Sequence, residues 1–151
     1  MPKKIKDIQF YEAVGRRKEA VARVRLYITG KDKTATIKDK KLNQGDIVIN
    51  DLPLVQAYNR LADQKRCLEP YALTKNTDRF VTTIHVTGGG KSGQLDAIVH
   101  GISRALNLMN TEEYRPTLKA KGLLTRDPRT RERRMVGTGG KSRRAKQSPK
   151  R

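Results

Sequence analysis

The chain has 151 residues, a formal net charge of +19 and a sequence pI near 10.5. That length suits one ordinary domain, and the charge far exceeds what solubility requires. Apolar residues make up only 35% of the chain and Trp is absent, so the core is small and a binder that stacks successive bases on aromatic side chains is disfavoured. We expect a polyanionic partner, with nucleic acid the commonest one.

The single cysteine, Cys67, excludes an internal disulfide, and the only histidines that could bind a metal together with it are His85 and His100. A spaced set of ligands for a structural zinc site is therefore lacking. The N-terminal residues do not form the continuous apolar stretch of a signal peptide, and no apolar run approaches the ~18 residues that span a bilayer. We expect Cys67 to be a packed thiol, and the protein to be cytoplasmic with no cofactor and no membrane partner.

Alternating residues predict a half-buried strand over residues 20–28, with Val24 on the inner face and Arg23 on a basic outer face. The strand is preceded by a predicted turn that begins at Gly15 and carries three consecutive cations, Arg16, Arg17 and Lys18. A lone triplet of this kind is usually a solvated charge cluster. The charge excess of the whole chain instead favours contact with phosphates.

The next stretch has weaker signals, which predict short strands near residues 34–38 and 46–50. Pro53 suits the first turn of a short helix that runs to Leu61 or Ala62. A second short helix is expected around residues 70–74.

The strongest strand signal is the β-branched and aromatic run at residues 79–87, in which Phe80, Ile84 and Val86 share one face. His85 lies on the opposite face. A lone histidine in a strand is more often a surface or packed residue than a catalyst, and no neighbour is placed to orient it as a base.

The clearest helix spans residues 94–109, where apolar side chains form one stripe. We expect His100, off that stripe, and Arg104, on the exposed side, to face RNA or water. The apolar stripe consists of Leu95, Ile98, Val99, Ile102, Ala105, Leu106 and Met109. A last short helix follows, with Thr111 as its cap and two acids in the first turn.

Between strand and helix, Gly88, Gly90 and Gly93 satisfy the G-x-G-x-x-G pattern of dinucleotide-binding loops. The context argues against a nucleotide cofactor, because no second parallel strand is predicted after the helix. The P-loop pattern fails as well, since His85 occupies the position of its first glycine. Two interpretations remain open: the loop and Lys91 bind an RNA phosphate at the helix N-terminus, or the glycines only permit a tight turn.

The C-terminal tail, which we define as residues 122–151, carries eleven Lys and Arg side chains against only Asp127 and Glu132. Its net charge of +9 leaves +10 for residues 1–121, so both parts are basic. After Val136 the tail has no large apolar residue. Such a segment does not fold alone, and we expect a polyanion to order it.

Three blocks of the sequence coincide with one family. The first is Gly15-Arg16-Arg17-Lys18 with Ala22-Arg23-Val24. The second is the glycine run with Ser92-Gly93-Gln94, His100-Gly101-Ile102 and Arg104-Ala105-Leu106, and the third is Leu124-Thr125-Arg126-Asp127 with Arg131-Glu132-Arg133 and the final Lys150-Arg151. In this order and spacing they resemble the ninth protein of the small ribosomal subunit, of bacterial or organellar type, over residues 11–151.

The resemblance implies an α+β fold in which a small sheet is packed by helices, as in domain two of the fifth small-subunit ribosomal protein. It divides the chain into an N-terminal extension (1–10), a globular RNA-binding body (11–121) and an extended basic tail (122–151). It further implies a structural protein without enzymatic activity or small-molecule substrate. The implied partners are ribosomal RNA in the subunit head, neighbouring head proteins and the tRNA in the peptidyl site.

On this basis we expect ribosomal RNA contacts from cations of the body and tail, together with one hydroxyl. They are Arg16, Arg17, Lys18, Arg23, Lys91, Ser92, Arg104, Arg126, Arg129, Arg131, Arg133, Arg134, Lys141, Arg143, Arg144 and Lys146. The terminal Lys150 and Arg151 would contact the tRNA. The chain departs from the family just before them, because Gln147 is followed by Ser148-Pro149 where the family commonly has an aromatic residue and a serine.

Two other classes of function compete with this interpretation. A free RNA chaperone or nucleoid-type binder would have the same composition, and only the family blocks argue against it. A nucleotide-dependent enzyme would use the loop at residues 88–93. Catalytic chemistry has no other support, because the sequence offers no Ser/His/Asp constellation and no paired carboxylates in an apolar setting.

Overall fold

The computed structural model describes residues 2–5, 8–29, 33–37, 40–140 and 142. Its strands are β1 (Lys3–Ile5), β2 (Ile8–Arg17), β3 (Ala20–Ile28), β4 (Thr34–Ile37), β5 (Lys40–Asn43), β6 (Ile47–Ile49), β7 (Leu52–Pro53) and β8 (Phe80–Thr87). Its helices are α1 (Leu54–Ala57), α2 (Leu61–Leu73), α3 (Lys91–Met109) and α4 (Thr111–Ala120).

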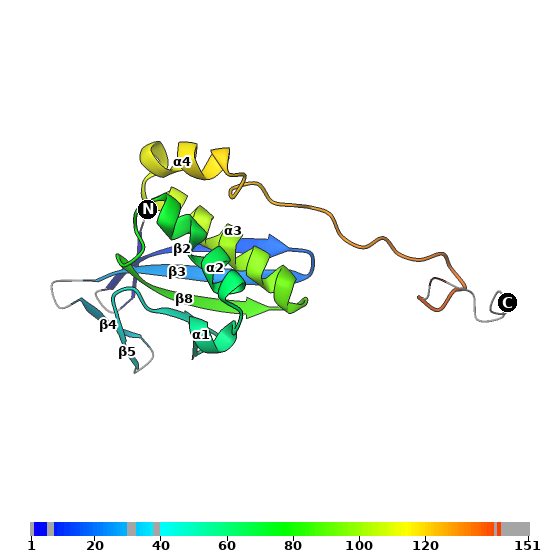
Figure 1. Ribbon diagram of the computed structural model, residues 1–151, viewed down its shortest axis with the longest axis horizontal. Helices are drawn as coiled ribbons and strands as arrows, with labels where there is room; N and C mark the ends of the chain where they lie inside the picture. Colours follow the sequence, from blue (N-terminus) through cyan, green and yellow to red (C-terminus); the bar gives the residue numbers. More distant parts are fainter. Residues whose placement is uncertain (1, 6–7, 30–32, 38–39, 141, 143–151) are drawn as a thin grey trace.

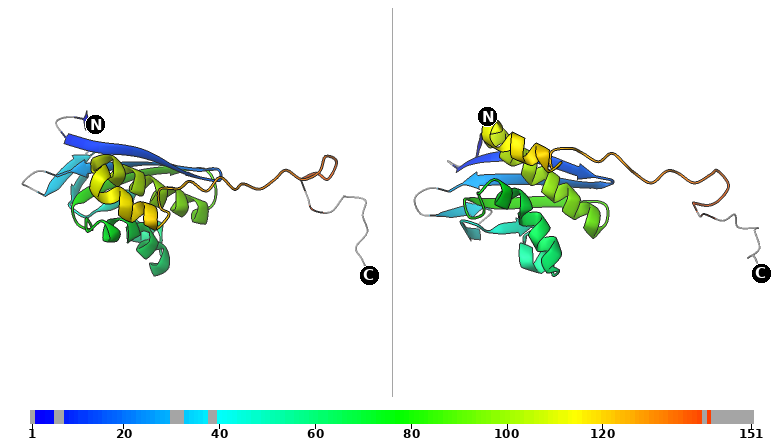
Figure 2. Two further views of the ribbon diagram at one scale, coloured as in Figure 1. Left: turned by 90° about the horizontal axis from the view of Figure 1, so that it is seen from above. Right: turned by 45° about the horizontal axis from the view of Figure 1, so that its top comes forward.

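Six strands form one mixed sheet in the order β1-β2-β3-β8-β6-β7. All neighbours are antiparallel except β6 and β8, which are parallel. The helices α2, α3 and α4 lie on one face of this sheet (Figures 1 and 2). The protein is therefore α+β, with a mixed sheet packed by helices.

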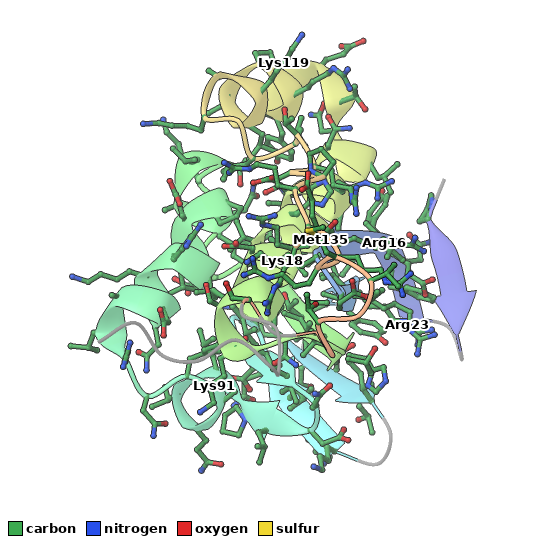
Figure 3. All side chains as sticks on the ribbon, turned by 90° about the vertical axis from the view of Figure 1, so that its right-hand side faces the viewer. Arg16, Lys18, Arg23, Lys91, Lys119 and Met135 are labelled. Carbon is green, nitrogen blue, oxygen red and sulfur yellow. The ribbon has the colours of Figure 1, made fainter. Side chains whose placement is uncertain are left out.

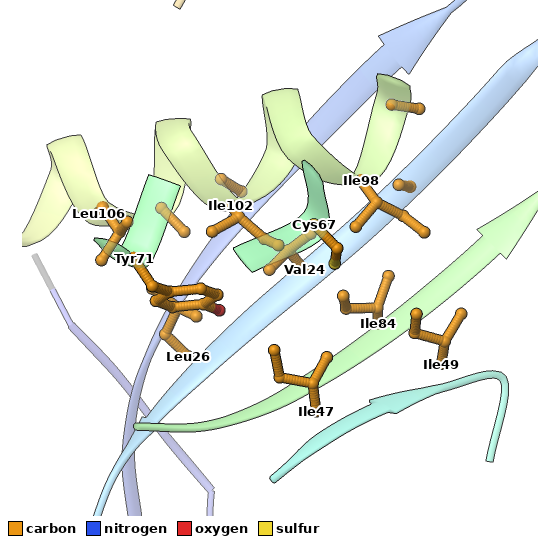
Figure 4. Packing of buried hydrophobic residues seen from close by; sticks show 14 of the residues in the cluster. Val24, Leu26, Ile47, Ile49, Cys67, Tyr71, Ile84, Ile98, Ile102 and Leu106 are labelled. Atoms are coloured by element: carbon orange, nitrogen blue, oxygen red, sulfur yellow. The ribbon is translucent and has the colours of Figure 1, made fainter. Parts of the chain in front are cut away.

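The core lies between the sheet and helix α3 (Figure 4). Val24 and Leu26 of β3 and Ile84 of β8 point into it, and Ile98 and Ile102 of α3 meet them. The predicted strands at residues 20–28 and 79–87 are thus confirmed to within one residue. Cys67 is fully buried in this cluster, as expected, and burial raises the pKa of its thiol to about 12.

Strand β2 was missed by the sequence analysis, which placed a turn at Gly15. The strand runs from Ile8 to Arg17, and the turn contains only Lys18 and Glu19. A division of the chain at residue 10 therefore falls inside a strand. Gly15 is needed for a different reason: a Cβ there would lie 1.9 Å from the carbonyl oxygen of Ala97 and 2.4 Å from the amide nitrogen of Gly101. Helix α3 thus crosses β2 so closely that the backbones of the two elements are in direct contact.

A short hairpin partly covers the other face of the sheet. Strands β4 and β5 pair with each other, and Ala35 packs with Phe10, Tyr27 and Val81. The predicted strand near residues 34–38 corresponds to β4 and the one near 46–50 to β6, whereas β5 was missed. Elsewhere on this outer face Arg23 and His85 are exposed.

The helical segments after Pro53 differ from the prediction. Helix α1 ends at Ala57, and a new helix, α2, begins at Leu61 and continues through Pro70. The sequence predicts a short helix that starts around Pro70, whereas Pro70 lies in the last turn of α2. Proline has no amide hydrogen, so the helix lacks the backbone hydrogen bond that residue 70 would otherwise donate to residue 66.

Helix α3 begins at Lys91, three residues earlier than predicted, and carries the expected apolar stripe. Its buried surface is wider than that stripe, because Ala97, Gly101 and Ser103 are buried too. In helix α4 the cap is Asn110 and not Thr111. The side chain of Asn110 accepts a hydrogen bond from the amide of Glu113 at 3.2 Å.

We expect Gly15→Ala to reduce the free energy of unfolding by at least about 3 kcal/mol, because all three atoms nearest to the new Cβ belong to the backbone and cannot move aside. Gly93→Ala is the matched control, since its Cβ would make ordinary contacts at 3.7 and 3.9 Å within a helix. We expect it to be neutral or to stabilise by about 0.5 kcal/mol. Urea unfolding measures both, and equal effects would contradict the proposed backbone contact.

Candidate nucleic-acid interface

Three chain segments bring cations together at one end of the body. These are the turn between β2 and β3, the loop from β8 into α3, and the start of the tail (Figure 1). The first two touch, because a Cβ at Gly88 would lie 2.3 Å from the carbonyl oxygen of Glu19. Figure 3 looks onto this end, with Lys18, Lys91, Arg16 and Arg23 around it. All four of these cations are exposed. We call this surface the basic end.

The outer sheet face contributes Arg16 and Arg23, which lie on neighbouring strands. Arg23 is opposite Val14 of β2 and His85 of β8 in the strand register. His85 is exposed on this face, as the strand periodicity predicted. The other outward arginine of β3 is different: Nε of Arg25 donates to Glu12 at 2.8 Å and its guanidinium lies over the ring of Phe10.

Two glycines of the loop between β8 and α3 are required by the local structure. Gly88 and Gly89 have φ values of +73° and +63°, a region that side chains rarely adopt, and both pack against the β2–β3 turn. Gly90 is the N-cap of α3, and Lys91 and Ser92 are exposed in the first turn. No strand follows α3 among the described residues. The loop therefore lacks the second parallel strand that a dinucleotide-binding unit requires.

Arg17 behaves unlike the cations on either side of it. Its Nε lies 3.4 Å from Asp96 of α3 and its Nη2 3.0 Å from Asp127 of the tail, while Nη1 donates to the carbonyl of Arg129 at 2.9 Å. Only 15% of the side chain is exposed. Asp96 also pairs with Arg66 of α2 at 2.8 Å. Arg17, expected to contact RNA, is thus engaged within the protein, because it points to the helix side of the sheet.

The expectation that His100 faces RNA or water is wrong. The residue is only 9% exposed, and its Nδ1 accepts a hydrogen bond from the backbone amide of Arg16 at 3.4 Å. The close crossing of α3 over β2 places this part of the helix against the strand. Burial lowers the pKa of His100, and the nearby charges of Arg104 and Arg126 act in the same direction. Arg104 is exposed as expected, and it donates to the carbonyl of Val14.

The start of the tail lies on the body. Leu123 and Leu124 pack against the core, and His100 hydrogen-bonds to the backbone of Leu124. Asp127 accepts from Nη2 of Arg129 at 2.6 Å, in addition to its contact with Arg17. The hydrogen bonds from Arg129, together with the charge of Arg17, hold the pKa of the Asp127 carboxyl far below its usual range.

Beyond these contacts the tail leaves the body. Residues 126–135 contain neither helix nor strand, and the chain runs away from the sheet (Figure 2). The cations of this part, Arg126, Arg129, Arg131, Arg133 and Arg134, are all exposed. The other expected contacts, Lys141, Arg143, Arg144, Lys146, Lys150 and Arg151, lie outside the described residues.

The roles of Asp96, Asp127 and His100 are not predicted by the sequence. The tail has two acids among eleven cations, Asp127 and Glu132, and both weaken its attraction to a polyanion, but only Asp127 forms an ion pair among the described residues. Among the described residues, no group of three His, Cys, Asp or Glu side chains is arranged to hold a metal ion. None of the described helices is long and apolar enough to cross a membrane.

Comparison with known proteins identifies close similarity over most of the chain. Residues 15–151 match the family described as ribosomal protein S9/S16. The small ribosomal subunit protein uS9 of Solidesulfovibrio magneticus is 40% identical over 132 residues, which cover 87% of this chain and 90% of the relative. The protein of the same name from Dehalococcoides mccartyi is 41% identical over 128 residues, covering 85% and 86%.

The buried His100 predicts a pH dependence of stability. Its pKa is lowered in the folded protein, so below the ordinary value of 6.5 the unfolded chain takes up a proton that the folded protein does not. The free energy of unfolding should therefore fall as the pH drops below about 6.5, by at most about 1.4 kcal/mol per pH unit. Asp127 contributes only at lower pH, below the ordinary carboxyl pKa of 3.8.

Urea unfolding between about pH 7.5 and 5 measures this slope, which spans the ordinary pKa of a histidine. His100→Asn should remove it, and His85→Asn, on the exposed strand face, should leave it in place. A slope that survives the first substitution and disappears with the second would contradict the assignment.

Proposed function

Because the chain belongs to the ribosomal protein S9/S16 family, we propose that its basic end and tail bind RNA within the small ribosomal subunit. We also propose that the terminal residues of the tail reach the peptidyl-site tRNA. Family membership makes the protein a structural, non-enzymatic constituent of that subunit, and so of the ribosome in the bacterial cytoplasm. It also implies binding to ribosomal RNA and to ribosomal neighbours. The match over residues 15–151 carries the proposal, since it includes the basic end and the whole tail.

The body contributes exposed groups at the basic end. We assign contacts with ribosomal RNA to Arg16, Lys18, Arg23, Lys91, Ser92 and Arg104, which are exposed in the folded protein. They are spread over two strands, the turn between them, the start of α3 and, at Arg104, a later turn of that helix, which suits a row of phosphates better than a single small anion. The partial positive charge of the α3 N-terminus adds to that of Lys91.

The tail contributes most of the remaining cations. Arg126, Arg129, Arg131, Arg133 and Arg134 are exposed, and Arg suits planar two-point contact with phosphate. Lys141, Arg143, Arg144 and Lys146 would continue the same RNA contact. Lys150 and Arg151 would then reach the tRNA, past Pro149, whose fixed φ stiffens the approach.

The architecture of the body supports two further assignments. A sheet with helices on one face is the arrangement expected for a relative of domain two of the fifth small-subunit protein, with the tail at 122–151 as an extended basic arm. The body at 11–121 then carries the RNA-binding surface together with strand residues of the extension at 1–10. Neighbouring proteins of the subunit head would contact the surface that RNA leaves free.

The rival functions have less support. A free RNA chaperone would share the charge, but family membership favours a fixed place in the subunit. A nucleotide-dependent enzyme would need the loop at residues 88–93 to hold a cofactor. That loop lies against the β2–β3 turn, and no parallel strand follows α3 among the described residues.

Phosphate contacts at the basic end predict a salt effect. We expect Lys91→Ala and Arg23→Ala each to weaken binding to a small-subunit ribosomal RNA transcript and to reduce the slope of log K against log salt by about 1. Lys75→Ala is the matched control, because Lys75 is exposed in the loop before β8, at the end of that strand far from Lys91. Equal slopes for all three variants would argue against the assigned surface. Titration at several salt concentrations measures them.

The tail end predicts a separable defect. A chain that stops at Pro149 should be incorporated into reconstituted small subunits normally, because the helices and strands of the body are formed by residues that precede the tail. Peptidyl-site tRNA binding should weaken by about tenfold, the equivalent of one charge-assisted contact. The double variant Lys65→Ala/Lys75→Ala removes the same charge from the body and should bind tRNA normally. Normal tRNA binding by the truncated chain would remove the tRNA assignment and leave the RNA-binding body intact.

A further inference from the structure

The first residues of the tail, 123–129, are fastened to the body by side chains from two elements. We call this segment the tail root. Two leucines, Leu123 and Leu124, give it apolar contact with the core. Beyond them, the direction of the chain depends on polar contacts, and Arg17 of β2 makes two of these. Its guanidinium reaches the carboxylate of Asp127 at 3.0 Å and the carbonyl of Arg129 at 2.9 Å.

Arg17 is itself held in place from the body side. Its Nε lies 3.4 Å from Asp96 of α3, and Asp96 is paired with Arg66 of α2 at 2.8 Å. The guanidinium therefore sits between two carboxylates, one on the body and one on the tail root. The side chains of Arg17, Asp96 and Asp127 are 15%, 25% and 30% exposed. This partial shielding lessens the screening that makes fully exposed ion pairs weak.

The position of Asp127 in the tail supports a structural role for this acid. Asp127 and Glu132 are the only acids in the tail, and each lowers its attraction to RNA. Asp127 meets Arg17 and Arg129, whereas Glu132 is exposed and makes no ion pair with any residue that the structure describes. A negative charge in an RNA-binding arm is expected to be unfavourable unless it makes an internal contact of this kind.

We propose that Arg17 and Asp127 form a clamp that fixes the direction in which the tail leaves the body. The two are positioning residues, and their benefit for RNA binding rests on the proposed function of the tail. Holding residues 127–129 in one conformation before binding removes an ordering cost from the binding step. The tail then starts next to the basic end, so both can follow the same RNA.

The pair Asp127→Asn and Glu132→Gln tests the clamp through affinity for a small-subunit ribosomal RNA transcript. Both variants remove one negative charge from the tail, so electrostatic attraction alone would tighten binding equally. The clamp instead predicts that only one of the two substitutions weakens RNA binding. Asp127→Asn should bind about tenfold more weakly, since ordering even one more residue costs about that much, whereas Glu132→Gln should bind as tightly as the unaltered chain or more so. Equal tightening in both variants would overturn the proposal.

Label-to-label distances in the free, full-length protein test the clamp without RNA. Spin labels on Val55→Cys of α1 and Thr130→Cys, just past the tail root, occupy exposed positions. Cys67 is fully buried and should stay unlabelled. The distance distribution should be narrow, should broaden with Asp127→Asn or Arg17→Gln, and should stay narrow with Glu132→Gln.

Equal widths in all variants would overturn the clamp even if the tail binds RNA as proposed. Conversely, a distribution that broadens only when the clamp is removed supports the clamp even if the tail fails to bind RNA. The two ideas can therefore fail separately.

Discussion

The arrangement of the basic end depends on one backbone contact, between Gly15 of β2 and Gly101 of α3. No side chain fits between the two elements there, so the helix lies as close to the strand as a helix can. This proximity lets His100 accept a hydrogen bond from the amide of Arg16. It also brings Asp96, one turn and a half earlier on α3, within reach of Arg17. A larger residue at either glycine would separate the helix from the strand and displace these contacts.

The sequence predicted the elements whose residues alternate or repeat clearly. Strands β3 and β8 and helix α3 have strong apolar patterns, because each packs one face against the core. Strand β2 was missed because Ala13 and Gly15 are small at the position where α3 crosses it, so its inward face has no large apolar stripe. Pro70 misled the prediction in a different way: local chemistry marked a helix start, but tertiary packing of Tyr71 and Cys67 continues α2 through it.

The sequence shows where the cations are, but it does not show which of them are free to contact RNA. Arg16 and Arg17 are neighbours, and read as members of one basic triplet they seemed equivalent. On a strand they point to opposite faces, so Arg16 is exposed while Arg17 points toward α3 and the tail. A prediction that β2 extends to Arg17 would have placed the two side chains on opposite faces of the sheet. The register and the crossing of α3 are long-range properties, and neither leaves a local signal in the residues around Gly15.

A clamp at the tail root matters because errors in direction grow along an extended chain. The residues after Arg129 span up to roughly 75 Å if fully extended, and a change of about 20° at the root would move the far end by roughly 25 Å at that length. The apolar contacts of Leu123 and Leu124 hold the chain near the body, but they leave its exit angle free. A guanidinium that contacts both a side chain and the backbone of the same segment restricts that angle. A modest ion pair at residue 127 therefore has more influence on where the tail can reach than a stronger contact further along it would have.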